Sequence, residues 1–263
     1  MYRPKRAVLI IGFLIFLFFV HLSGYSQKFL FRPGFGFIRT FNSGILKPRE
    51  EGFKTPANNL NFVGSLGIEY HVSDKFSLEA SFENGILGYS YSLRKGGNSC
   101  LIVYTHFEGF DVLQLNLGIN RISKPFQLMK AFHKQYSCKL KISLGTGVNK
   151  FGRKNSELNE SQYFYKSVCP DGYDSLRATT RLLTKTAAFG IHGWVKTGIR
   201  VFNQKRKELF DLSLFYNMGL TKHYEADIDY YLNNDFYTAK LRSKGSHMGF
   251  KVGFPIRIKQ KQP

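Results

Sequence analysis

The chain has 263 residues, 43% of them hydrophobic, and its 38 Lys and Arg residues outnumber 18 Asp and Glu to give a formal net charge of +20. The hydrophobic content excludes a disordered chain, and three cysteines are too few for a disulfide scaffold. The length suits one or two soluble domains or a single closed barrel, so the order of the residues must decide.

Residues 1–26 predict a secretory signal peptide. A basic start precedes an apolar run over residues 7–20, and small residues follow up to Ser26. The run has 14 residues, fewer than the roughly 20 that a membrane-spanning helix needs. We therefore expect cleavage near Ser26 and a mature domain comprising residues 27–263.

The rest of the chain predicts strands, because apolar residues recur there with period two and so share one face of an extended backbone. Over residues 248–258, for example, large apolar side chains alternate with glycine, lysine, proline and arginine. Each strand reaches the roughly 9–11 residues that a tilted strand needs to cross a bilayer. Eight such strands are predicted, at about residues 28–39, 60–72, 75–92, 106–120, 136–149, 185–203, 208–224 and 244–258.

The strands and their connections together predict an all-β fold, an eight-stranded antiparallel up-and-down transmembrane β-barrel. Only closure satisfies every backbone polar group of a sheet in lipid. The turns at 73–74 and 204–207 are short and would be periplasmic, whereas 121–135 is a longer exception that could hold a helical turn or extra strand length. Long extracellular loops are expected at residues 40–59, 93–105, 150–184 and 225–243.

The third predicted strand interrupts its own alternation. Leu78 and Phe82 share one face, but the apolar residues then shift to the parity of Leu87 and Tyr89. One inserted residue reverses the facing of everything that follows it. We therefore expect a β-bulge near Asn84 and Gly85.

Two segments resemble a known family. The stretch GSLGIEYHVSDKFSLEASFENGILGYSY (64–91) resembles the strand, tight turn, strand unit of the outer-membrane β-barrel family common in Bacteroidota, and KELFDLSLFYNMGLT (207–221) is similar to its penultimate strand. The resemblance implies a monomeric barrel in the outer membrane of a diderm bacterium, without assigned catalysis. It also implies that an accessory role in secretion is open to this chain.

The face opposite the apolar rows carries charged residues that are predicted to form a network in the lumen. Charges on this face cost little only if they are paired or hydrated, which favours ion pairs that plug a narrow bore. A small-solute or anion-permeable channel is the alternative, because basic residues outnumber acidic ones there. The predicted network consists of Arg32, Glu69, Glu79, Glu83, Lys141, Lys196, Arg200, Asp211, Lys251 and Arg257.

No catalytic, metal or cofactor site is predicted. A nucleophile needs a base within hydrogen-bond reach, and no compact Ser, His and carboxylate cluster occurs. A hydrolase that modifies lipid A remains a minor alternative. Cys100 and Cys169 fall in two loops of the same outer side and could form a disulfide, whereas Cys138 has the lipid-facing parity of its strand.

The positive charge does not predict nucleic-acid binding, because no basic helix or known nucleic-acid fold is recognisable. The cations gather in the predicted periplasmic turns, where they can meet anionic headgroups. The expected partners are outer-membrane lipid and a protein of an envelope or secretion complex, contacted through the loops or the periplasmic side. A soluble, lipocalin-like barrel would instead turn its apolar rows inward.

Overall fold

The computed structural model establishes an all-β architecture. No helix among the described residues is long and apolar enough to cross a membrane. The structure describes residues 29–41, 53–54, 60–96, 101–131, 134–152, 161–169, 172–181, 187–232 and 235–256. The predicted signal peptide, Cys100 and Arg257 lie outside these residues, so the predictions for them stay predictions.

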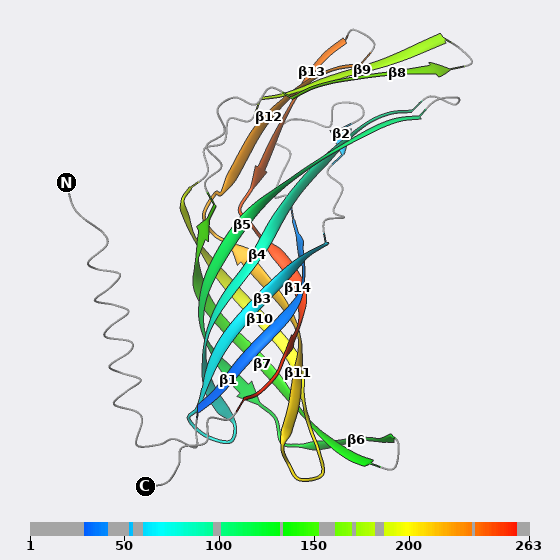
Figure 1. Ribbon diagram of the computed structural model, residues 1–263. Helices are drawn as coiled ribbons and strands as arrows, with labels where there is room; N and C mark the ends of the chain where they lie inside the picture. The colour runs from blue at the N-terminus through cyan, green and yellow to red at the C-terminus, as the bar shows by residue number, and fades with distance from the viewer. Residues whose placement is uncertain are drawn as a thin grey trace, which may run out of the picture.

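Eight antiparallel strands form a closed barrel, as predicted (Figure 1). Each is paired with the next, and the barrel is closed by the ladder between its last and first strands, in which Gly253 pairs with Gly34 and His247 pairs with Thr40. The strands are tilted around the axis, which is the geometry that closure requires. In barrel order they are β1 (Phe29–Thr40), β3 (Leu60–His71), β4 (Phe76–Gly96), β5 (Leu101–Ile122), β7 (Lys134–Phe151), β10 (Phe189–Phe202), β11 (Glu208–Gly219) and β14 (His247–Gly253).

The barrel carries its apolar rows outside and its polar rows inside. Along β5, Leu115, Leu117 and Ile119 are 46–51% exposed, whereas the alternate residues Asn116 and Asn120 are buried. The other barrel strands also expose their apolar rows and bury their polar rows, whereas a soluble barrel would do the opposite. An exterior of this kind is the surface that a membrane-spanning β-barrel presents to lipid.

One end of the barrel is built from short connections. The turn between β3 and β4 covers residues 72–75, and Arg206 in the turn between β10 and β11 adopts a positive φ of 55°. The third connection contains β6 (Phe126–Ala131), which pairs with the start of β7 and provides the extra strand length that the sequence left open. We call this the short-turn end, and it is also where the described chain begins and ends.

The opposite end carries a second, four-stranded antiparallel sheet beyond the barrel (Figure 1). The predicted long connections lie at this end, but they contain strands where the sequence predicted loops. Strands β4 and β5 also run on past the barrel as one hairpin, with which β2 (Phe53–Lys54) pairs. In sheet order the four strands are β13 (Asp235–Ser243), β12 (Tyr224–Leu232), β9 (Gly172–Arg181) and β8 (Ser161–Cys169).

The predicted bulge in β4 is wrong. Pairing with β3 and β5 continues without a register shift through Asn84 and Gly85. Leu87 therefore keeps its inward parity, and its side chain is 0% exposed. The apolar residues of the sequence shift from one parity to the other because the interior itself becomes apolar at this level.

Candidate functional site

The centre of the lumen is organised around the carboxylate of Glu69, which is 0% exposed. Arg32 Nε lies 2.6 Å from Glu69 Oε2, and Arg200 Nη2 lies 2.6 Å from Oε1. Ser77 Oγ also donates a hydrogen bond to Oε1, and Asn120 Nδ2 donates another over 3.3 Å. One carboxylate thus joins side chains from five strands of the barrel wall, β1, β3, β4, β5 and β10.

The remaining ion pairs extend this hub along the bore. Arg32 donates two hydrogen bonds to Glu208, over 2.6 and 3.0 Å. Lys141 Nζ lies 2.5 Å from Asp211 Oδ2. We call the whole set the lumen network: Arg32, Glu69, Glu79, Glu83, Lys141, Lys196, Arg200, Glu208, Asp211 and Lys251.

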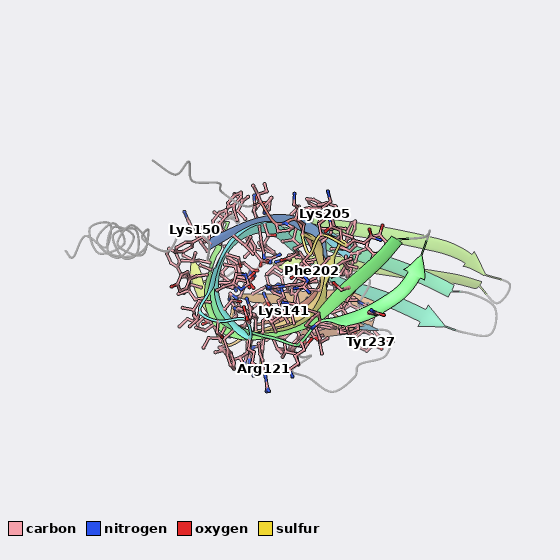
Figure 2. The ribbon with its side chains drawn as sticks, turned by 90° about the horizontal axis from the view of Figure 1, so that it is seen from below. Arg121, Lys141, Lys150, Phe202, Lys205 and Tyr237 are labelled. Atoms are coloured by element: carbon pink, nitrogen blue, oxygen red, sulfur yellow. The ribbon has the colours of Figure 1, made fainter. Side chains whose placement is uncertain are left out.

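Two further pairs reach the middle of the barrel. Lys196 Nζ lies 2.5 Å from Glu79 Oε1, and Lys251 pairs with Glu83. The lumen network therefore contains five cations and five carboxylates. Figure 2, viewed along the barrel from the short-turn end, shows Lys141 inside the ring of strands.

The structure brings together every residue of the predicted network that it describes. Glu208 was missed, because its parity in β11 is that of the lipid-facing rows. The register shifts between the pairs Val201–Phe210 and Phe202–Glu208, so Leu209 is an extra residue in β11 and Glu208 turns to the lumen face. The bulge lies in β11 itself, where the consecutive apolar residues Leu209 and Phe210 interrupt the alternation of the sequence.

An aromatic layer lies above the charges. The Trp194 indole is 7% exposed, and Lys196 Nζ lies 4.9 Å from its ring centroid. Lys251 Nζ lies over the Phe215 ring in the same way, 5.1 Å from its centroid. Such contacts let an aromatic ring share in stabilising a desolvated ammonium group. Gly118 leaves the space for the indole, since a Cβ there would lie 2.3 Å from Trp194 Cζ2.

A layer of neutral polar side chains follows, which the sequence did not predict. His192 Nε2 and Asn116 Oδ1 are 2.7 Å apart. His247 Nδ1 donates to the Gly245 carbonyl over 2.9 Å, which leaves its Nε2 to accept from Asn217 Nδ2 at 3.0 Å. Amides and imidazoles pair with one another here without net charge.

An apolar layer closes the bore toward the second sheet. Leu87, Phe110 and Phe151 are all at most 3% exposed. His223, in the connection between β11 and β12, stacks on Phe151 with ring centroids 3.6 Å apart and meets Phe110 edge-on. Burial lowers the pKa of His223 to about 4.

The burial of His223 predicts a pH dependence of stability. Its neutral form is favoured in the folded protein, so its contribution is complete above a pH of about 6.5 and is lost as the pH falls towards 4. His223→Phe keeps an aromatic ring but cannot be protonated. Between pH 7.5 and pH 5 we expect this variant to lose about 2 kcal/mol less of its free energy of unfolding than the wild type. Urea unfolding of both proteins at the two pH values measures the difference, and equal losses would contradict the assignment.

Two small cavities lie inside the described barrel. One of about 30 Å³ lies among Arg32, Lys141 and Lys196, and another of about 10 Å³ lies beside Trp194 and Phe215. Spaces of this size hold about one or two water molecules. In the part of the chain that the structure describes, no three His, Cys, Asp or Glu residues gather to hold a metal ion.

The two described cysteines lie in different parts of the fold, one in the barrel and one in the second sheet. Cys138 is a free thiol on the outward parity of β7 and is buried. Cys169 ends β8 in the second sheet, but Cys100 falls between β4 and β5, outside the described residues. The disulfide between Cys100 and Cys169 therefore stays a prediction.

No protein-family model matches the chain, and no curated protein matches it. Among solved structures it is similar to the outer membrane protein OprG from Pseudomonas aeruginosa, with 12% identity, a TM-score of 0.38 and coverage of 89% of this chain and 97% of that one. Ail, the attachment invasion locus protein of Yersinia pestis, has 11% identity and a TM-score of 0.30, with coverage of 88% of this chain and 99% of that one. The outer membrane protein AlkL has 12% identity and a TM-score of 0.32, with coverage of 91% of this chain and 95% of that one. These likenesses are distant, and the barrel is established by its own strand pairing.

Proposed function

We propose that this protein is an integral barrel of the outer membrane of a diderm bacterium whose bore does not conduct. It acts as a structural or interaction protein, with the short-turn end in the periplasm and the second sheet outside the cell. The observation that carries this proposal is the filled lumen. Ion pairs, an aromatic layer, an amide layer and an apolar layer follow one another along the bore.

The electrostatics of the bore favour a plug over an anion path. The channel alternative depended on an excess of basic residues on the lumen face. Glu208 reduces that excess, and each of the five cations of the lumen network lies within 4.0 Å of a carboxylate. An anion entering the bore would have to displace a carboxylate such as Glu69 from two guanidinium groups. Such buried charge pairs are costly to separate.

The second sheet is the surface best suited to a protein partner. Its edge strands β13 and β8 each pair on one side only among the described strands, and an unpaired edge can accept a strand from another chain. At the tip of the β12–β13 hairpin, Tyr231 and Phe236 are 37% and 55% exposed, with ring centroids 5.0 Å apart. Exposed aromatic rings of this kind are enriched in protein interfaces. A component of an envelope or secretion complex is the proposed class of partner.

Conductance measurement separates the plug from the channel. The purified, refolded protein is checked for heat-modifiable migration on a gel and then added to a planar bilayer, with an open porin as the positive control. We expect no steady conductance, because the cavities described in the bore are no larger than one or two water molecules. A reproducible steady channel would overturn the proposal and favour the small-solute or anion path.

A further inference from the structure

The lipid-facing wall has an apolar groove of about 480 Å³ across β3, β4, β5 and β7. Its sides include Leu78, Leu117 and Leu144. The short side chain of Ala80 leaves the space between them, and the paired backbones of Gly118 and Gly145 form part of the floor. The groove lies within the exposed apolar rows, so a hydrocarbon chain is the matching occupant.

A cluster of cations lies directly below this groove. Arg121 follows Ile119, a groove residue, by two positions on the same face of β5, or roughly 7 Å further towards the short-turn end. Figure 2 shows Arg121 at the outside of the barrel, in contrast to Lys141 within it. The exposed residues Lys75 and Lys124 belong to the two adjoining turns, which are joined by a 2.7 Å hydrogen bond from Ile122 N to the Lys75 carbonyl.

These three cations are available to a ligand. None of them forms an ion pair within 4.0 Å with another described residue, although the exposed carboxylate of Asp74 lies in the same turn as Lys75. The position of Lys124 is fixed by Ser123, which exchanges backbone and side-chain hydrogen bonds with Leu140. Fixed backbone with free side chains suits capture of a phosphate.

We propose that the groove and the cations below it form a binding site for an anionic diacyl phospholipid of the leaflet at the short-turn end. One acyl chain lies in the groove against Ala80 and Leu117, and the phosphate is held by Arg121 and Lys124, with Lys75 beside them. The inference goes beyond the non-conducting barrel but rests on its location in the membrane. A lipid combines the two chemistries that the surface places one above the other.

Native mass spectrometry of the full chain released from detergent micelles tests the site. The probes are phosphatidylglycerol, which is anionic, and phosphatidylcholine, which is zwitterionic, and the apparent Kd of the first bound lipid is measured for each. We expect the wild type to prefer phosphatidylglycerol. The double variant Arg121→Gln/Lys124→Gln should weaken its binding about tenfold and leave phosphatidylcholine almost unchanged. Ala80→Phe should weaken both lipids by filling the groove.

Matched variants distinguish a site from general attraction. Lys205→Gln/Lys207→Gln removes the same charge from the turn between β10 and β11, and Thr197→Phe adds a ring to the lipid-facing side of β10; neither lies at the groove. Both controls should bind phosphatidylglycerol like the wild type. Equal weakening in the two charge variants, or equal affinity of the wild type for both lipids, would overturn the inference.

Heat-modifiable migration on a gel shows whether the chain has folded, so it distinguishes failure of the proposed membrane barrel from failure of the proposed lipid site. A wild-type chain that does not fold into micelles would refute the proposed membrane barrel itself. A folded chain without selectivity for phosphatidylglycerol would refute only the lipid site. The headgroup and groove variants lie on different strands, so if one of them fails to fold the other still decides.

Discussion

Glu69→Gln is expected to lower the free energy of unfolding by about 3–5 kcal/mol, the usual cost of removing one partner from a buried ion pair. The substitution keeps the shape of the side chain but leaves the guanidinium of Arg200 without its closest counter-charge. Arg32 is affected less, because Glu208 remains bound to it. Urea unfolding in micelles measures the change, and the fluorescence of Trp194, the one tryptophan in the chain, reports it.

The matched control is Glu225→Gln in the second sheet. Glu225 also meets several cations, Lys222, Lys240 and Arg242, but these are 35–51% exposed. Partly exposed pairs contribute about 0–1 kcal/mol, so this variant should unfold almost like the wild type. The double variant Glu69→Gln/Arg200→Gln should recover part of the loss, because the unpaired charge is gone. A small effect of Glu69→Gln would mean that water, and not Glu69, compensates these guanidinium groups.

Gly118→Ala is expected to destabilise the barrel by about 3 kcal/mol, the upper part of the range for overpacking. The added methyl group would lie 2.3 and 2.5 Å from Trp194 Cζ2 and Cη2, and 2.6 Å from the carbonyl oxygen of Leu144. The indole and the backbone of β7 must both move. The emission of Trp194 should shift to longer wavelength as the ring leaves its dry position, and heat-modifiable migration should be lost at a lower temperature.

Gly64→Ala provides the control for this second experiment. A Cβ at Gly64 meets no atom closer than 4.0 Å, the carbonyl oxygen of Asn84. The same chemical change should therefore shift stability by no more than about 0.5 kcal/mol. If the two glycine variants behaved alike, the position of Trp194 between β5 and β7 would be wrong.

The alternation of the sequence was sufficient to predict the barrel strands and which face looks outward. Lipid on one side and a charged bore on the other impose opposite demands on successive residues, as at Leu117 and Gly118 or Leu140 and Lys141. The signal fails where both faces are apolar. Leu87 points inward to meet Phe110 and Phe151, so a strand of constant register looked like one with a bulge.

The sequence predicted which residues belong to the lumen network better than it predicted which of them pair with each other. Inward parity picked out Glu69 and Arg200, but 131 positions separate them, and only closure of the barrel brings them together. Glu208 lacked the parity signal. His192 and Asn116 carry no formal charge at neutral pH, so nothing in their composition distinguishes a buried hydrogen-bonded pair from two solvated side chains.

The lumen network has a consequence for how this protein is made. Its pairs connect strands that are far apart round the barrel, such as β3 with β10 and β4 with β14. A partly assembled sheet cannot form these bonds, and its ten ionised groups would enter hydrocarbon uncompensated. Biogenesis must therefore keep the nascent lumen hydrated until the first and last strands meet. We therefore expect closure of the barrel, which neutralises the interior, to precede full contact of the chain with hydrocarbon.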